Sequence, residues 1–385
     1  MNIKVLMKKY TMLIALVVVF VLFAILTEGR LLIPQNLSNL LLQNSYVLIM
    51  ACGMLLCILT GGNVDLSVGA TVCLVGAVAA QLLEAGLHAL IVIPLCLIIA
   101  ALIGIWQGFW IGHVHVPPFI CTLAGMFLFR GLARAILGSK TVIVDDKTFL
   151  GIFASYINIP GIDDGDVKWS AFWAGCIVAV MLIVQKCITR SNRRKSGYKQ
   201  ESLLSDFTKL VISDLLILAY TWQIAHFRGI SVMAVWVMAI ICVYEFITTK
   251  LAAGRYFYAV GGSEKAARLS GVDTKKVYFM AYMSISLLAG LSGLIVAARI
   301  GSVSGDTGSS FEMDAIGACF IGGASAYGGS GTIMGVLVGA ILLGVINQGM
   351  SIIGLDNNWQ YIVKGAVLLI AVIFDVVSNR KTGKA

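Results

Sequence analysis

Long apolar stretches alternate with short polar connections along the whole chain. A helix that crosses a bilayer needs about 20 mostly apolar residues, and twelve stretches approach or exceed this length. None of them alternates with the period of two that a membrane β-barrel shows. The predicted segments are 10–27, 39–60, 67–86, 88–112, 117–138, 170–189, 210–228, 230–250, 277–300, 313–330, 331–353 and 358–377. We therefore predict an all-α, polytopic membrane protein.

The composition excludes most other classes of protein. Hydrophobic residues make up 59% of the 385 positions and charged residues only 12%, about half of the charged fraction of a soluble domain. Disordered chains and coiled coils are excluded by the same values. The nine cysteines all lie in apolar stretches and form no C-x-x-C pair. We interpret them as small buried hydrophobic residues and not as disulfides or metal ligands.

The distribution of charge predicts the orientation of the segments. Lysine and arginine gather at the amino terminus, in 186–209, in 250–276 and in the tail, whereas aspartate and glutamate gather in 139–169 and 301–314. Short cytoplasmic loops collect basic residues, so we place the four basic regions, including both termini, in the cytoplasm. Twelve segments satisfy all of these placements. The formal net charge of +9 therefore reflects orientation and not nucleic-acid binding.

Two glycine-rich places interrupt the helical pattern, at 60–69 (TGGNVDLSVG) and at 321–331 (IGGASAYGGSG). Glycine frees the backbone from helical geometry, and irregular backbone survives in a membrane only where protein or water covers it. In transporters, interruptions at corresponding positions of two halves point to the substrate path. A similar glycine-spaced helix is expected after each interruption, which indicates a weak internal repeat.

Catalytic and metal-binding motifs are missing from the sequence. It contains no phosphate-binding loop, no G-x-S-x-G, no H-E-x-x-H and no EF-hand loop. His113 and His115 lie two residues apart, on different helix faces, and no third ligand is near, so we expect no metal site. The middle of the segments also lacks the acidic chain of ion-coupled carriers. The energy for any transport would then come from elsewhere.

Only a few charged residues fall inside or beside the apolar segments. Asp65 has two interpretations: either Asp65 or Ser67 caps the helix that begins at 67, or Asp65 lines a polar cavity or pairs with an arginine inside the membrane. Arg130 and Arg134 lie on one helical face near the outer end of their segment, where snorkelling to the interface explains them. The same interpretation applies to Asp214, Glu245, Arg299 and Lys364.

The loop at 251–276 contains a predicted short helix. Ser263 is a typical N-cap, the following residues through Leu269 favour a helix, and Gly271 ends it. A short cytoplasmic helix between two membrane helices can dock in a groove of a partner protein. The alternative is an ordinary helix at the membrane interface.

Several stretches in the same order resemble one known family over nearly the whole chain. They are 62–69 (GNVDLSVG), 116–123 (VPPFICTL), 254–271, 290–298 (GLSGLIVAA), 314–331 (DAIGACFIGGASAYGGSG) and 359–375. The chain resembles permease subunits of bacterial ABC-type monosaccharide importers, in the ribose, xylose and galactose branch. Asn63 departs from the family, which commonly has glycine there.

The chain is also longer than a typical ribose permease. In this greater length it resembles permeases of the xylose or multiple-sugar type. We assign the extra length to an inserted helix pair. The predicted parts are 1–169 (amino-terminal transmembrane half), 170–228 (the inserted pair with a basic cytoplasmic loop) and 229–385 (carboxy-terminal half with the coupling loop 251–276). Ten core helices and the inserted pair make up the twelve segments.

The resemblance implies a division of labour in the bacterial inner membrane. Two permease chains, as a homodimer, form the path, a separate ATP-binding subunit binds ATP and Mg, and an extracytoplasmic sugar-binding protein delivers the cargo. This chain would be a non-catalytic subunit in the lipid bilayer, without a cofactor, that passes xylose or several sugars to the cytoplasm by alternating access. The residues implied for coupling to the ATPase are Arg255, Glu264, Arg268, Ser270 and Gly271.

A sugar path needs walls that form hydrogen bonds. The candidates are Gln43, Asn44, Asn63, Asp65, Thr122, Asn347, Gln348 and Gln360. Each of them could instead make an interhelical hydrogen bond. Three other functions stay open: transport of branched-chain amino acids or nucleosides, a membrane-embedded transferase, and a self-sufficient secondary carrier. The transferase would need clustered His, Asp and Glu residues at one interface, which the sequence lacks.

Overall fold

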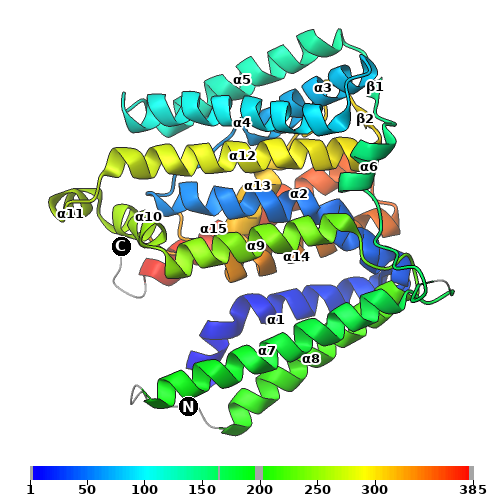
Figure 1. Cartoon of the computed structure of the whole chain (residues 1–385). Helices are drawn as coiled ribbons and strands as arrows, with labels where there is room; N and C mark the ends of the chain where they lie inside the picture. The colour runs from blue at the N-terminus through cyan, green and yellow to red at the C-terminus, as the bar shows by residue number, and fades with distance from the viewer. Residues whose placement is uncertain (1–2, 164, 196–202, 381–385) are drawn as a thin grey trace.

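The computed structural model describes residues 3–163, 165–195 and 203–380, and helices dominate this part of the chain (Figure 1). The elements are α1 (Ile3–Leu26), η1 (Arg30–Leu32), α2 (Pro34–Leu59), α3 (Val68–Glu84), α4 (Ala89–Gly112), α5 (Pro118–Leu137), β1 (Val142–Ile143), α6 (Lys147–Phe153), α7 (Trp169–Lys195), α8 (Leu203–Ala225), α9 (Val232–Lys250), α10 (Ala252–Gly262), α11 (Glu264–Leu269), α12 (Thr274–Ile300), β2 (Ser302–Val303), α13 (Phe311–Ile321), α14 (Ile333–Ile353) and α15 (Asn357–Arg380). The predicted all-α, polytopic fold is confirmed.

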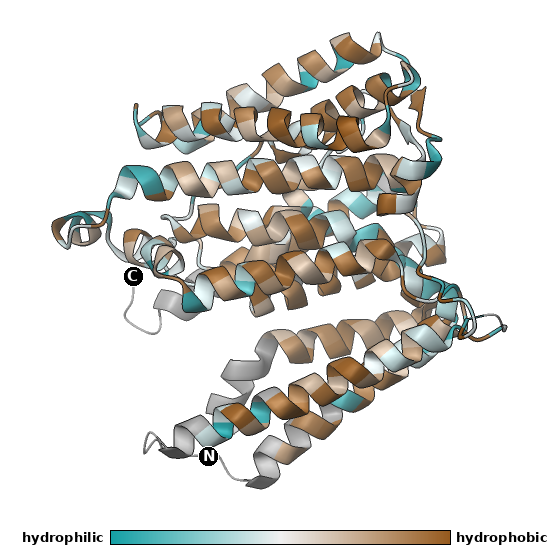
Figure 2. Ribbon diagram, in the orientation of Figure 1, coloured by the Kyte–Doolittle hydropathy of each residue, from teal (hydrophilic) through white to brown (hydrophobic). Residues whose placement is uncertain are grey.

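Each of the twelve predicted segments overlaps a helix. Within the described ranges, seven helices are long and apolar enough to cross a membrane by length and composition: α2, α4, α5, α7, α9, α12 and α14. Apolar parts of α1, α3 and α15 are shorter. Large apolar side chains stay exposed on the outward faces of α4, α5 and α9, where Figure 2 shows mostly hydrophobic colours. Lipid is the solvent that suits such a surface.

The prediction is wrong for the segment 313–330. The helix there, α13, ends at Ile321 after 11 residues, which span about 16 Å and so only half of the apolar part of a bilayer. The glycine-rich backbone beyond it turns away, and Gly323 adopts a φ of +86°. The interruption predicted at 321–331 is therefore confirmed, and it leaves α13 as a half-length helix followed by an irregular segment.

Helix α12 lies in the centre of the bundle, between α4 and α2 (Figure 1). Small residues permit this close packing. A side chain at Gly104 of α4 would meet the Met283 backbone of α12, and one at Gly293 of α12 would meet the backbone of Val72 in α3. The helices α2 and α12 are accordingly mostly buried. Close contact through small residues is the expected mode of helix association in lipid.

The cysteines follow the prediction only in part. All nine are free, and six are buried. Cys187 of α7 and Cys242 of α9 are exposed, because they lie on the apolar surface and not in the core. The prediction of burial is wrong for these two.

The two acidic loops lie at one end of the molecule, as the charge distribution predicts. Val142 of β1 pairs with Val303 of β2 in an antiparallel register, which joins the loop at 139–169 to the loop at 301–314. The helices α10 and α11 lie at the opposite end, together with the start of α1 and the end of α15 (Figure 1). We call the end with β1 and β2 the outer end and the other the inner end.

The helices α7 and α8 pack mainly on each other and diverge from the bundle (Figure 1). Asp163 stabilises the turn that precedes α7. Its carboxylate accepts hydrogen bonds from the backbone N–H groups of Ile159, before the turn, and of Ser170, in the first turn of α7, both at 2.9 Å. Burial raises the pKa of Asp163, but the bonds from Ser170 and Ile159 outweigh it and leave the pKa below its usual value. The assignment of 170–228 as an insertion stays a prediction. Residues 196–202 of the basic loop, Asp164 and the basic tail beyond Arg380 lie outside the described residues.

Candidate functional site at the two broken helices

The two irregular segments that interrupt the helices meet at the inner end. Residues 60–67 connect α2 to α3, and residues 322–332 connect α13 to α14. The backbone N–H of Gly329 donates a hydrogen bond to the carbonyl oxygen of Leu59 at 3.0 Å. Two places that lie more than 250 residues apart in the chain are thus directly bonded. The sequence predicts both interruptions, and the structure adds that they touch.

Glycine is required where these segments touch. A side chain at Gly62 would meet the carbonyl oxygen of Ala326, and one at Gly328 would meet the backbone of Gly61. Gly62 and Gly328 also have positive φ values, +76° and +85°, which L side chains avoid. Gly261 of α10 joins the same contact, as described below. We call Gly61, Gly62, Gly261, Gly328 and Gly329 the glycine junction.

Asp65 is fully buried in the first irregular segment. Its Oδ1 accepts hydrogen bonds from the backbone N–H and the hydroxyl of Ser67, at 2.8 and 2.7 Å. Gln107 of α4 donates to the same hydroxyl oxygen. The second carboxylate oxygen, Oδ2, has no hydrogen-bond partner among the described residues. Asp65 therefore orders the turn that precedes α3 by bonding its N-cap residue Ser67, but neither side chain caps a residue inside the helix. No arginine in the described ranges pairs with Asp65.

The predicted path residues fall into separate groups. Asn44 of α2 donates to the Ala340 carbonyl of α14 at 2.6 Å, and Gln348 of α14 donates to the Asn36 carbonyl of α2 at 3.2 Å. These two amides join α2 to α14, which is the interhelical alternative that the sequence left open. Near Gln348, Asn347 has a buried Oδ1 without a partner among the described residues.

The other predicted path residues bond locally or stay exposed. Asn63 donates to the Thr60 carbonyl at 3.2 Å, and Thr122 donates to the Pro118 carbonyl of its own helix at 2.9 Å. Gln360 donates to Leu355, and Gln43 is exposed on α2. The structure does not gather all eight residues into one lining. Their role in a sugar path stays a prediction.

The sequence missed a buried ion pair between α13 and α15. The Lys364 ammonium lies 3.0 Å from Oδ1 and 3.2 Å from Oδ2 of Asp314. The hydroxyl of Tyr46 in α2 donates to the same carboxylate at 2.7 Å, and its ring stacks on Phe311 with centroids 3.7 Å apart. The interpretation of Lys364 as a snorkelling residue is wrong, because only 22% of its side chain is exposed. A buried charge in a membrane domain needs such a partner.

Arg130 also differs from its interpretation. Its guanidinium donates to the backbone carbonyls of Gly305, Thr307 and Gly308, the Thr307 contact being 2.6 Å. Arg130 thereby ties α5 to the outer loop between β2 and α13. Arg134, one turn later, forms an exposed ion pair with Asp306 at 2.8 Å.

The predicted short helix after Ser263 is confirmed as α11, whereas its role in coupling stays a prediction. The Ser263 hydroxyl accepts a hydrogen bond from the N–H of Ala266 at 3.3 Å, and Gly271 follows the helix with a φ of +85°. Leu269 at its end is 81% exposed. The proposed coupling residues Arg255, Glu264, Arg268, Ser270 and Gly271 are all exposed. The sequence missed α10, which precedes α11 and carries Arg255.

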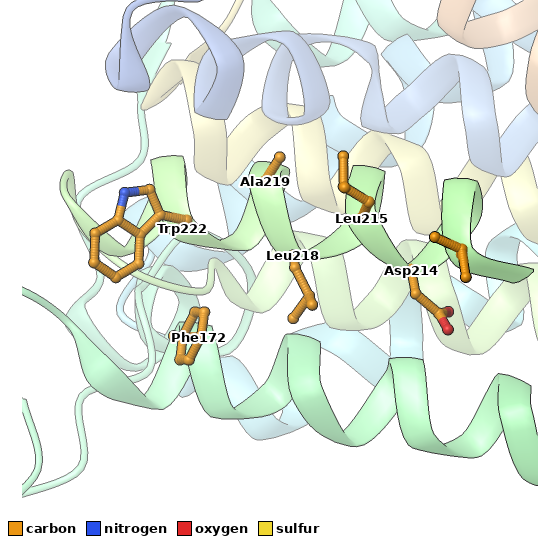
Figure 3. A pocket seen from close by; sticks show the side chains of 7 residues that line it. Phe172, Asp214, Leu215, Leu218, Ala219 and Trp222 are labelled. Atoms are coloured by element: carbon orange, nitrogen blue, oxygen red, sulfur yellow. The ribbon is translucent and has the colours of Figure 1, made fainter.

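A shallow apolar hollow of about 520 Å³ lies on α8, and none of the predicted path residues lines it (Figure 3). Its lining is Phe172, Val211, Asp214, Leu215, Leu218, Ala219 and Trp222. The structure assigns no ligand to this hollow. Among the described residues, no three His, Cys, Asp or Glu side chains form a group that could hold a metal ion.

The chain matches one family model over most of its length. Residues 36–372 match the family described as branched-chain amino acid transport system / permease component. The xylose transport system permease protein XylH of Haemophilus influenzae is 34% identical over 375 residues, which cover 97% of each chain. XylH of Escherichia coli strain K12 is 32% identical over 374 residues, which cover 97% of this chain and 93% of that protein. The ribose import permease protein RbsC of the same strain is 33% identical over 363 residues, which cover 94% and 92%.

No solved structure matches the chain. The family match nevertheless includes both irregular segments and the α10–α11 region. The similarity to xylose and ribose permeases confirms the resemblance that the sequence motifs indicated. The chain therefore belongs to this family of transport permeases, as a multi-pass protein of the bacterial inner membrane.

Proposed function

We propose that this chain is the membrane subunit of an ATP-driven importer for xylose or several monosaccharides. The observation that carries the proposal is its similarity to a xylose permease over 97% of both chains. The broken helices would form part of the path, since irregular backbone inside a membrane protein marks substrate sites in transporters. Alternating access would move the two halves around this region.

The two ends of the molecule fit different partners. At the inner end, α11 leaves Leu269 and several charged side chains exposed, which suits docking on a separate ATP-binding subunit that holds ATP and Mg. At the outer end, the loops joined by β1 and β2 offer a surface for an extracytoplasmic sugar-binding protein. A second copy of the permease would complete the path. The chain itself has no catalytic role in this proposal.

Uptake should require all three components. In liposomes, the permease together with its ATP-binding subunit and sugar-binding protein is expected to accumulate labelled xylose when ATP is inside. The permease alone, even with a proton or sodium gradient, is expected to accumulate nothing, because it contains no energy source of its own. Accumulation by the isolated chain would contradict the proposal and favour a secondary carrier. Transport of leucine but not xylose by the complete system would favour the amino-acid alternative, which the family description supports.

Exchanging both Glu264 and Arg268 for alanine should weaken docking of the ATP-binding subunit by about two- to tenfold, the effect of one or two exposed ion pairs. Both side chains are exposed on α11, so the fold should persist. The measurement is the affinity between the solubilised permease and the ATP-binding subunit. Lys147→Ala, which removes an exposed charge from α6 at the outer end, is the control. Equal affinity of the double variant and the control would exclude α11 as the docking element.

A further inference from the structure

Two tyrosine hydroxyls connect α10 and α11 to the two irregular segments. Tyr258 of α10 donates to the carbonyl oxygen of Gly331 at 3.0 Å. The hydroxyl of Tyr278, in α12, lies 3.2 Å from the carbonyl oxygen of Thr60 and 3.1 Å from Oε2 of Glu264 in α11. Each irregular segment is therefore reached by one tyrosine. Tyr258 lies inside the predicted coupling loop 251–276 but is not among the residues named for coupling, and Tyr278 lies outside that loop.

The carbonyls that accept these bonds lie where helical hydrogen bonding stops. Thr60 directly follows α2, and Gly331 lies just before α14 with a φ of +154°. Such carbonyl groups need hydrogen-bond partners in a membrane protein, and that of Thr60 also accepts a bond from Asn63 at 3.2 Å. A phenolic hydroxyl can donate only one proton. Tyr278 therefore divides its single donor between Thr60 and Glu264.

The backbone completes the connection between the three elements. Gly329 bonds to Leu59, and a side chain at Gly261 of α10 would meet both the Leu59 carbonyl and the Gly329 nitrogen. The end of α10 thus lies directly on the contact between the two segments. No flexible side chain separates these backbones, so a displacement of α10 acts on both segments through this contact in addition to the tyrosine bonds.

We infer that Tyr258 and Tyr278 are positioning residues that transmit motion of α10–α11 to the broken helices, Tyr278 to 60–67 and Tyr258 to 322–332. The inference rests on the proposed function, in which an ATP-binding subunit docks on α11. When docking moves Glu264 away from Tyr278, the Tyr278 hydroxyl donates to the Thr60 carbonyl alone. This hydrogen bond then becomes stronger and restrains residues 60–67 more tightly. The two tyrosines act on different segments, so their effects are separable.

The test uses the complete transporter, with hydrogen exchange measured in peptides that cover 58–67 and 322–332. In the wild type, adding the ATP-binding subunit should change exchange in both peptides. Tyr278→Phe should reduce the change mainly in the first peptide, and Tyr258→Phe mainly in the second, while the backbone contact of Gly261 leaves part of each change in place. Both variants should transport about two- to tenfold less sugar per ATP hydrolysed, the effect of one hydrogen bond.

Tyr220→Phe is the matched control. Tyr220 of α8 also donates to a backbone carbonyl, that of Leu37 in α2 at 3.5 Å. This bond lies near the outer ends of α8 and α2, far from the glycine junction at the inner end. The variant should leave exchange in both peptides and the transport ratio unchanged. If the wild type couples and both junction variants behave like this control, the inference is overturned and the proposed function stands. If the wild type does not couple transport to ATP hydrolysis, the inference and the proposed function are both contradicted.

Discussion

Replacing Lys364 with methionine is expected to lower the free energy of unfolding by about 3–5 kcal/mol, the usual cost of breaking a buried ion pair from one side. The substitution removes the ammonium that lies 3.0 Å from Asp314 and keeps most of the side-chain volume. The side chain of Asp314 is only 4% exposed, so water cannot replace the lost partner. The Tyr46 hydroxyl would remain as a single donor. Chemical unfolding of the detergent-solubilised permease measures the loss.

Two further variants separate this effect from a general loss of charge. Arg134→Met breaks the exposed pair with Asp306, whose side chains are 57% and 81% exposed, and should cost at most about 1 kcal/mol. Adding Asp314→Asn to Lys364→Met should restore most of the stability, because asparagine is neutral and still accepts from Tyr46. A Lys364→Met variant no less stable than Arg134→Met would show that the buried pair does not hold α13 against α15.

Hydropathy and charge predicted most of the fold, because a membrane requires apolar helices across its core and favours basic residues in the cytoplasmic loops. Every predicted segment contains a helix, and the opposite charges of 139–169 and 250–276 placed their loops at opposite ends. The end of α13 at Ile321 agrees with the glycine-rich interruption predicted at 321–331. The error was to extend the segment 313–330 through these glycines, because hydropathy alone does not show where a helix stops.

Contacts between distant residues limited the prediction of the site. Asp314 and Lys364 lie 50 residues apart, and each alone looks like a charge near the end of a segment. Asn44 and Gln348 likewise bond to backbone carbonyls of another helix, which no local pattern indicates. Ser263 and Gly271 could be assigned in advance, because a cap and a terminating glycine act within one turn.

The helix α10 was missed for a related reason. Glycines at 254, 261 and 262 lower the helix propensity of this stretch by about 1 kcal/mol each relative to alanine. The structure nevertheless forms a helix there, because its apolar face, which includes Phe257 and Val260, is buried against the bundle. Gly261 costs propensity but permits the contact with Leu59 and Gly329. Tertiary packing thus outweighs the local preference.

The same contact predicts a sharp difference between two neighbouring glycines. Gly261→Ala should lower the free energy of unfolding by about 1–3 kcal/mol or more, the cost of overpacking, and should abolish transport. Its new methyl group would meet the Leu59 carbonyl and the Gly329 nitrogen, which are backbone atoms and cannot rotate away. In Gly262→Ala nothing lies within 4 Å of the added carbon, so this variant should be neutral or more stable by up to about 1 kcal/mol.

Both substitutions make the same chemical change in the same helix, so helix propensity and expression affect them alike. Chemical unfolding in detergent and sugar uptake in liposomes with the partner proteins measure the difference. A glycine junction that serves only as a flexible linker would tolerate both variants. Equal stability and equal uptake would therefore contradict close packing of α10 on the two broken helices, and with it the path by which docking at the inner end reaches them. Loss in Gly261→Ala alone would show that this backbone contact itself is required for transport.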